Sequence, residues 1–154
     1  MNMTLTNVTF NISEVPSHFA RIAALNEIAC EVGYANLSFY EGQAALADLY
    51  VNDKFKFLWP RFCPVFTRTI NYRSQGIGSA LLVKAIEYCQ HKNYPTLTGI
   101  LDPNGDRDRL TAFYRRFGFS VNKGFISLVL SPSPNLLHND VFAYQSRRYT
   151  KHYT

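Results

Sequence analysis

The most informative stretch of the sequence is Asn71-Tyr72-Arg73-Ser74-Gln75-Gly76-Ile77-Gly78-Ser79, which stands between a predicted strand and a predicted helix. A helix N-terminus offers unpaired N–H groups and the positive end of the helix dipole. Glycines at positions 76 and 78 lack the Cβ atoms that would keep a phosphate group away from those amides. The stretch therefore predicts an anion cradle, and a diphosphate is its natural ligand.

Two better-known glycine loops do not fit this stretch. A P-loop requires Gly-Lys-Ser/Thr at its end, but Gly78 is followed by Ser79-Ala80. A dinucleotide-binding loop requires a third glycine, and Leu81 stands at that position. The alternative without a ligand is a tight turn from strand to helix that merely needs small residues.

The elements around the glycine loop predict a mixed sheet. A strand–helix–strand of this length implies a right-handed crossover between parallel strands. We therefore expect an α/β or α+β fold. The predicted elements are a strand over 63–70, an amphipathic helix over 77–91, a strand over 96–101 that ends in Asp102-Pro103-Asn104-Gly105, a helix over 107–117 that stops at Gly118, and a strand over 125–130.

The first sixty residues give weaker signals. Residues 7–12 alternate with period two, which predicts a strand. The apolar residues of 19–32 follow a helical stripe, with Ser17 as N-cap and Gly33 as the stop. The Ala- and Leu-rich segment 43–50 also predicts a helix, and the aromatic segment 55–59 predicts a strand closed by Pro60.

Arg73 stands three residues before Gly76, and this spacing makes the loop specific. Arg/Gln-x-x-Gly-x-Gly/Ala between a strand and an amphipathic helix resembles the acetyl-CoA-binding signature of the GNAT acetyltransferase superfamily. A second segment, Ala112-Phe-Tyr-Arg-Arg-Phe-Gly-Phe119, resembles the family's aromatic-Tyr-x-x-x-Gly-Phe segment in its expected place. The resemblance covers about residues 62–130.

The resemblance implies a mixed central sheet with two splayed parallel strands, flanked by helices. It implies that the backbone of Arg68, Thr69 and Ile70 binds the pantetheine arm, and that one N–H there polarises the thioester carbonyl. Asn104 is the candidate for a further pantetheine contact, because Arg107 and Leu110 stand where the family often has Asn and Ala. The residues implied to hold the pyrophosphate are Arg73, Ser74, Gln75, Gly76, Ile77, Gly78 and Ser79.

Tyr114 matches the family's frequent general acid, which protonates the departing thiolate. A phenol is mostly protonated at neutral pH and can donate a hydrogen bond. Its alternative role is that of a core aromatic beside Phe113 and Phe117. Segment 63–70 holds no carboxylate, so the base stays open between Glu41, Asp48, Asp53, water, and direct attack by a neutral amine.

Composition bounds the rest. The 154 residues suit one domain over 1–134, followed by a basic extension over 135–154 that either packs on a second subunit of a homodimer or is mobile. No apolar run reaches a membrane span and no signal-peptide pattern is present, so we expect a cytoplasmic protein without membrane contact. Three widely spaced cysteines and scattered histidines suggest neither a disulfide framework nor a metal.

The favoured function is acetyl-CoA-dependent transfer of an acetyl group to an amine of unknown identity, by direct attack in a ternary complex. The net charge of +5 keeps aminoacyl-tRNA open as a less favoured acceptor. Two alternatives come from another class: a non-catalytic module that binds acyl-CoA, and a nucleic-acid-binding module.

Overall fold

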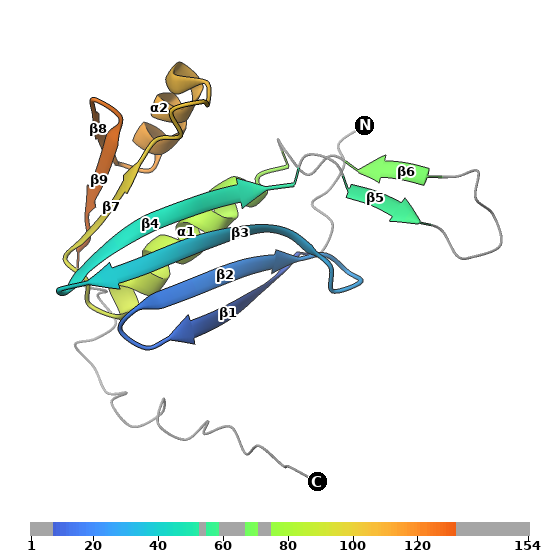
Figure 1. The fold of residues 1–154 in the computed structure, drawn as a ribbon, viewed down its shortest axis with the longest axis horizontal. Coiled ribbons are helices and arrows are strands. Elements are labelled where there is room, and N and C mark those ends of the chain that lie inside the picture. The colour runs from blue at the N-terminus through green and yellow to red at the C-terminus, as the bar shows by residue number, and fades with distance from the viewer. Residues whose placement is uncertain (1–7, 53–54, 59–66, 71–74, 132–154) are drawn as a thin grey trace, which may run out of the picture.

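The computed structural model describes residues 8–52, 55–58, 67–70 and 75–131 (Figure 1). Within these residues, neither helix is long and apolar enough to cross a membrane. The elements are β1 (Thr9–Val15), β2 (Phe19–Leu25), β3 (Glu31–Tyr40), β4 (Gln43–Val51), β5 (Phe55–Leu58), β6 (Thr67–Ile70), α1 (Ile77–His91), β7 (Thr96–Ile100), α2 (Arg107–Arg116), β8 (Ser120–Asn122) and β9 (Phe125–Val129).

A seven-stranded mixed sheet organises the fold, in the order β1-β2-β3-β4-β7-β9-β8. All of its pairs are antiparallel except β4 and β7, which are parallel. Helix α1 lies against one face of β2, β3 and β4 (Figure 1). The predicted α+β class with a mixed central sheet is confirmed.

The parallel pair at the centre of the sheet is short. Only Ala44–Leu46 of β4 pair with Leu97–Gly99 of β7. Gly99 permits this close approach, since a methyl group there would lie 3.1 Å from the carbonyl oxygen of Leu46. On the other side of β4, the register with β3 shifts so that Ala47 has no direct partner, which is a β-bulge. Beyond this point, β4 and β7 no longer pair.

The core lies between α1 and the sheet. Leu81, Leu82, Ala85 and Cys89 of α1 have no exposed surface. They pack with alternate residues of the strands, because successive side chains of a strand point to opposite faces. Each fully buried leucine of this kind contributes roughly 1.5–3 kcal/mol. The strand residues of this cluster that have no exposed surface are Ala20, Ile22, Ala24, Val32, Ala35, Leu37, Ala44 and Leu97.

The helix predicted over 19–32 is wrong, because this segment forms β2, a turn and the start of β3. The turn is built by Asn26, whose side-chain oxygen accepts hydrogen bonds from the backbone N–H groups of Ile28 (3.2 Å) and Cys30 (2.9 Å). Ser17, the predicted N-cap, has φ 65° in the tight turn before β2, and Gly33 lies within β3 instead of ending a helix.

The helix predicted over 43–50 is also wrong, since this segment is β4. Glu41 (φ 48°) and Gly42 (φ 76°) form the turn between β3 and β4, and both have the positive φ that tight hairpins require. That turn sets β4 antiparallel to β3. Pairing with two neighbouring strands overrides the helical preference of the Ala- and Leu-rich sequence.

The glycine loop is not preceded by the strand that was expected beside β7. Thr67–Ile70 form β6, which pairs with β5 in a separate two-stranded sheet. Residues 59–66 lie outside the described part, so only Phe55–Leu58 of the strand predicted over 55–59 is confirmed. The crossover to β7 therefore starts from β4, and the prediction that it starts from segment 63–70 is wrong.

The predicted elements after the glycine loop are confirmed. They are α1, β7, α2 and β9, with Gly118 at φ 86° directly after the C-cap of α2. The strand predicted over 7–12 corresponds to β1, whereas β8 was not predicted.

Gly33 offers a test of how tightly β3, β4 and α1 pack. A methyl group there would lie 2.8 Å from the Tyr50 carbonyl oxygen and 3.2 Å from Cδ1 of Leu81. We expect Gly33→Ala to lower the free energy of unfolding by about 1–3 kcal/mol, because overpacking forces the backbone to shift. Urea denaturation measures this change. Ser38→Ala, an exposed site on the same strand, serves as the control, and equal stability of the two variants would contradict the packing described.

Candidate active site

A cleft of about 1230 Å³ opens where β4 and β7 part. One wall is the second half of β4, and the opposite wall is α2 with the loop before it. The first residues of α1 close one end. The lining residues are Leu46–Val51, Gly76, Gly78, Ser79, Ile100–Pro103, Gly105, Asp106, Arg109, Leu110, Ala112–Tyr114 and Arg116.

The N-terminus of α1 has the features of the predicted anion cradle. Gly76 is its N-cap with φ 79°, and no side chain caps the helix. Among the described residues, a methyl group at Gly76 would meet no atom within 4 Å, so the helix is not crowded at this point. Gly76, Gly78 and Ser79 all line the cleft. The first amides of a helix have no partner within it, so they are available to an anion there.

The other residues predicted for this loop fall in three places. Ile77 is 2% exposed and belongs to the core, so its side chain is structural. Gln75 is described but is not among the residues that line the cleft. Arg73 and Ser74 lie outside the described residues.

Tyr114 is 8% exposed and lines the cleft from α2. Its ring packs edge-on against Phe113 (5.1 Å between centroids) and Phe119 (5.5 Å). Burial, and then the negative charge of Asp48, raise the pKa of Tyr114 to about 12. The phenol therefore keeps its proton at neutral pH. Its role as a general acid stays a prediction, but the residue has both the core packing and the access to the cleft that such a role requires.

Asp48 follows the bulge in β4 and also lines the cleft. It was one of three carboxylates considered as a base. Of the other two, Glu41 lies in the turn between β3 and β4 and does not line the cleft, and Asp53 lies outside the described residues. Of the three carboxylates, Asp48 is therefore the one that the structure shows in the cleft, which Tyr114 also lines.

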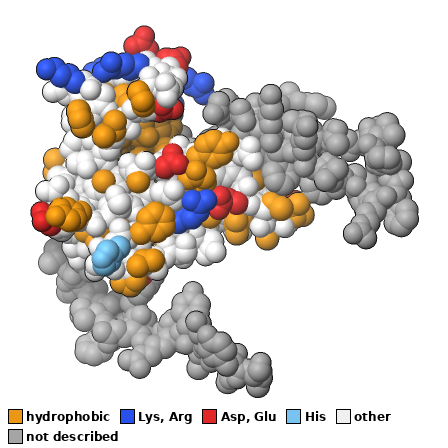
Figure 2. Space-filling view, viewed as in Figure 1, with side chains coloured by type: hydrophobic (Ala, Val, Ile, Leu, Met, Phe, Trp, Pro, Cys, Tyr) orange, Lys and Arg blue, Asp and Glu red, His pale blue; other side chains and the backbone are white. Residues whose placement is uncertain are grey.

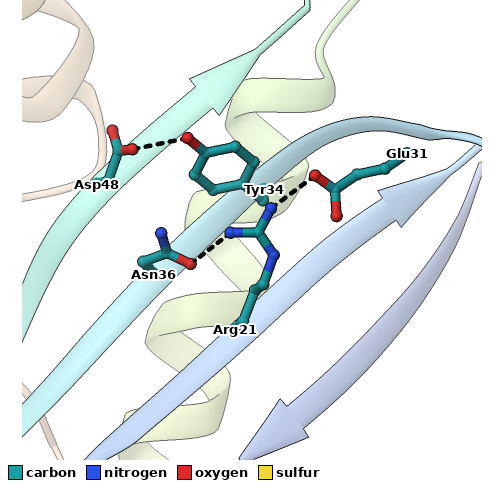
Figure 3. A network of polar contacts seen from close by, with 5 residues as sticks. All are labelled: Arg21, Glu31, Tyr34, Asn36 and Asp48. Carbon is teal, nitrogen blue, oxygen red and sulfur yellow. Dashed lines mark hydrogen bonds and ion pairs between the residues drawn. The ribbon is translucent and has the colours of Figure 1, made fainter.

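A polar network holds Asp48 on the face of the sheet opposite α1 (Figure 3). The hydroxyl of Tyr34 donates a 2.9 Å hydrogen bond to the Asp48 carboxylate. The guanidinium of Arg21 lies 3.8 Å from the centroid of the Tyr34 ring. It also donates hydrogen bonds to Glu31 (2.6 Å) and Asn36 (3.0 Å). These contacts join β2, β3 and β4.

The loop between β7 and α2 is ordered by its own hydrogen bonds. The carboxylate of Asp102 accepts one from the backbone N–H of Asn104 (2.9 Å), and Asp106 caps α2 through the N–H of Arg109 (3.1 Å). Asn104 was predicted to contact pantetheine, but it is not among the lining residues. Leu110, which stands in the family's alanine position, does line the cleft.

The strand predicted to carry pantetheine lies in another sheet than expected, and its contact with pantetheine stays a prediction. Arg68, Thr69 and Ile70 lie on β6, which pairs with β5 and not with a strand of the large sheet. Ala44–Leu46 of β4 pair with β7 instead, and Ala47–Val51 continue β4 along the cleft. The sequence does contain a sign that 43–51 is a strand. Ala44 and Leu46 alternate with less buried positions, and the alternation resumes at Leu49 and Val51, shifted by one residue. A bulge at Ala47 produces this change of phase.

Comparison with known proteins supports one family. Residues 69–119 match the model of the acetyltransferase (GNAT) family. None of the curated proteins compared is significantly similar in sequence.

Several solved structures share the fold, at identities of 15–16% that carry no argument beyond it. One is the PaiA N-acetyltransferase from Thermoplasma acidophilum in complex with coenzyme A (16% identity, 73% of this chain, 61% of that chain, TM-score 0.53). Another is a putative GNAT acetyltransferase from Desulfovibrio desulfuricans (15% identity, 81% of this chain, 100% of that chain, TM-score 0.59). A third is a GNAT N-acetyltransferase from Escherichia coli in complex with CoA (15% identity, 85% of this chain, 86% of that chain, TM-score 0.56). This chain thus spans about three fifths of the length of the Thermoplasma protein.

The raised pKa of Tyr114 predicts a loss of stability at high pH. The folded state keeps the phenol neutral up to about pH 12, whereas the unfolded chain ionises near pH ~10. The stabilising contribution is therefore complete below pH ~10 and is lost as the pH rises from there towards 12. Relative to wild type, we expect Tyr114→Phe to lose about 1 kcal/mol less stability between pH 8 and pH 11. Urea denaturation at both pH values measures this, and parallel losses would contradict the burial of the hydroxyl.

Proposed function

We propose that this chain, which matches the acetyltransferase (GNAT) family model over residues 69–119, transfers an acetyl group from acetyl-CoA to an amine by direct attack in a ternary complex. The observation that carries the proposal is a single cleft that joins an uncapped helix N-terminus to a buried tyrosine and a carboxylate. An anion cradle, a proton donor and a proton acceptor in one cleft suit acyl transfer from a phosphorylated thioester.

The residues that would hold acetyl-CoA follow from the cleft. The amides at Gly76–Ser79 would accept the pyrophosphate at the positive end of α1. The edge of β4 over Ala47–Val51, which does not pair with β7, would offer its backbone groups to the pantetheine arm. When bound, the cosubstrate supplies an activated thioester carbonyl. A backbone N–H of this part of β4 would stabilise the negative charge that develops on its oxygen.

The protein's own groups account for the protons. Asp48 takes a proton from the ammonium of the acceptor, which leaves a neutral amine as nucleophile. The nitrogen forms a bond to the acetyl carbon and the bond from that carbon to sulfur breaks. The nitrogen then releases its second proton to solvent, and Asp48 releases to solvent the proton that it took. The departing thiolate receives the proton of Tyr114, which then regains one from solvent. The products are an amide, free coenzyme A and one proton.

A negative charge introduced at position 76 tests the proposed site of the pyrophosphate. Gly76→Asp and Gly76→Asn impose the same strain at φ 79°, and both residue types tolerate the left-handed region. They differ in one negative charge. We expect Gly76→Asp to weaken acetyl-CoA binding at least ~10-fold more than Gly76→Asn, because a carboxylate repels the pyrophosphate. Isothermal titration calorimetry on folded variants measures both. Equal affinities would place the pyrophosphate elsewhere.

Tyr114→Phe separates an enzyme from a module that only binds acyl-CoA. We expect the turnover number to fall about 10²–10⁴-fold, with little change in the Kd of acetyl-CoA, because the variant loses only the proton donor. Thiol release with an amine acceptor gives the rate, and calorimetry gives the Kd. Tight binding by wild type without transfer to any amine tested would favour the non-catalytic alternative.

A further inference from the structure

We propose that the acceptor is a primary alkylammonium, and that Tyr34, Tyr50 and Asp48 bind it on the face of the sheet opposite α1. The inference rests on the proposed function and specifies its acceptor. Tyr34, Tyr50 and Asp48 lie together on β3 and β4, and Asp48 and Tyr50 also line the cleft. The site therefore joins this face of the sheet to the cleft.

The strand register places these side chains on one face. Ala20, Ile22 and Ala24 of β2 are buried under α1, so the residues between them point the other way. Arg21 is directly opposite Asn36, and Asn36 is opposite Asp48. Tyr34 is likewise opposite Tyr50. In the close view α1 lies behind the sheet and the network stands in front of it (Figure 3).

The two tyrosines and the carboxylate form the surroundings that an ammonium group prefers. The ring centroids of Tyr34 and Tyr50 are 5.6 Å apart, with 33° between the ring planes. Tyr50 is 42% exposed, so a ligand can reach it. Asp48 is fixed beside them by the hydrogen bond from Tyr34. One face of the Tyr34 ring already holds the Arg21 guanidinium. The exposed Tyr50 ring would therefore supply most of the attraction to a cation through its quadrupole, and the carboxylate adds an opposite charge.

The charges of this face also favour a cation. Arg21 and Glu31 neutralise each other in a 2.6 Å ion pair, which leaves the negative charge of Asp48. The chain as a whole carries +5, and on the face shown in Figure 2 several Lys and Arg side chains gather over α2 at the top, beside acidic ones. The network is therefore an acidic site on a protein whose overall charge is positive.

The contacts of Arg21 narrow the class of acceptor further. Its guanidinium is held by the Tyr34 ring, Glu31 and Asn36. Its positive charge is thus already paired within the network, which makes it a poor partner for a carboxylate of the acceptor. A free α-amino acid would bring its carboxylate next to Asp48, where like charges repel. Alkyl diamines and lysine side chains carry the ammonium without that carboxylate, and both fit the site.

Direct binding of amines tests the site without catalysis. Wild-type protein is titrated with putrescine, with Nα-acetyl-lysine amide and with glycine, in the absence of acetyl-CoA, and followed by ¹H–¹⁵N NMR. We expect one or both of the first two to bind at least ~10-fold more tightly than glycine, with shifts at the amides of β3 and β4. The difference between putrescine and the lysine derivative identifies the source of the ammonium. Tightest binding by glycine would overturn the proposal.

Variants assign the binding to named groups. Asp48→Asn is expected to weaken amine binding at least ~10-fold, since it removes the charge and keeps the shape. The control Asp108→Asn removes the same charge from the exposed first turn of α2 and should bind amines as wild type does. Tyr50→Leu is expected to weaken binding ~3–10-fold, and Tyr50→Phe to restore it, because phenylalanine keeps the aromatic face.

The acetyl transfer assay separates the two claims. For Tyr50→Leu we expect a higher KM for the amine with an unchanged Kd of acetyl-CoA. An unchanged KM of the amine in Tyr50→Leu, together with unchanged amine binding by Asp48→Asn, would overturn this inference and leave the proposed function standing. Amine binding that depends on Asp48 and Tyr50, without any transfer, would support the site and count against the proposed function.

Discussion

The short parallel contact between β4 and β7 is the constraint on which the rest of the structure depends. Three residue pairs hold the two halves of the sheet together, and Gly99 allows the backbones to approach at that point. The bulge at Ala47 then changes the direction of β4. Because the strands part there, the sheet opens a cleft at its centre instead of at its edge. Beyond Leu46, the edge of β4 does not pair with β7, and this is the edge proposed to bind the thioester ligand.

The same opening brings together groups of opposite electrical character. The N-terminus of α1 contributes the positive end of its dipole, and Asp48 on β4 contributes a negative charge. The first suits the phosphates of a cosubstrate, and the second suits the ammonium of an acceptor. Tyr114 lies in the cleft with both, and its burial keeps it protonated. The two proposed ligands would thus be drawn to different ends of the cleft by their opposite charges.

The sequence predicted the second half of the fold better than the first, for physical reasons. In the segments of α1 and α2, the apolar residues repeat with helical spacing between glycines and turn residues, and this pattern fits a helix only. In residues 19–32, alanines and branched residues are so frequent that the same apolar set fits a helix and a strand. Only pairing across the sheet decides between them. The cradle at Gly76 and the tyrosine were identifiable from local spacing, whereas the role of β4 depends on contacts between distant segments.

The point where the chain leaves β4 and the point where it enters α1 are close neighbours. A methyl group at Gly78 would lie 3.4 Å from Cγ2 of Val51, although the β5–β6 hairpin intervenes in the chain. The segment between them is a closed loop whose entropic cost grows only with the logarithm of its length, by roughly 0.6 kcal/mol per doubling. The β5–β6 hairpin can therefore change in length at little cost in stability. This part of the chain is free to acquire new surfaces while the fold that carries the chemistry stays as it is.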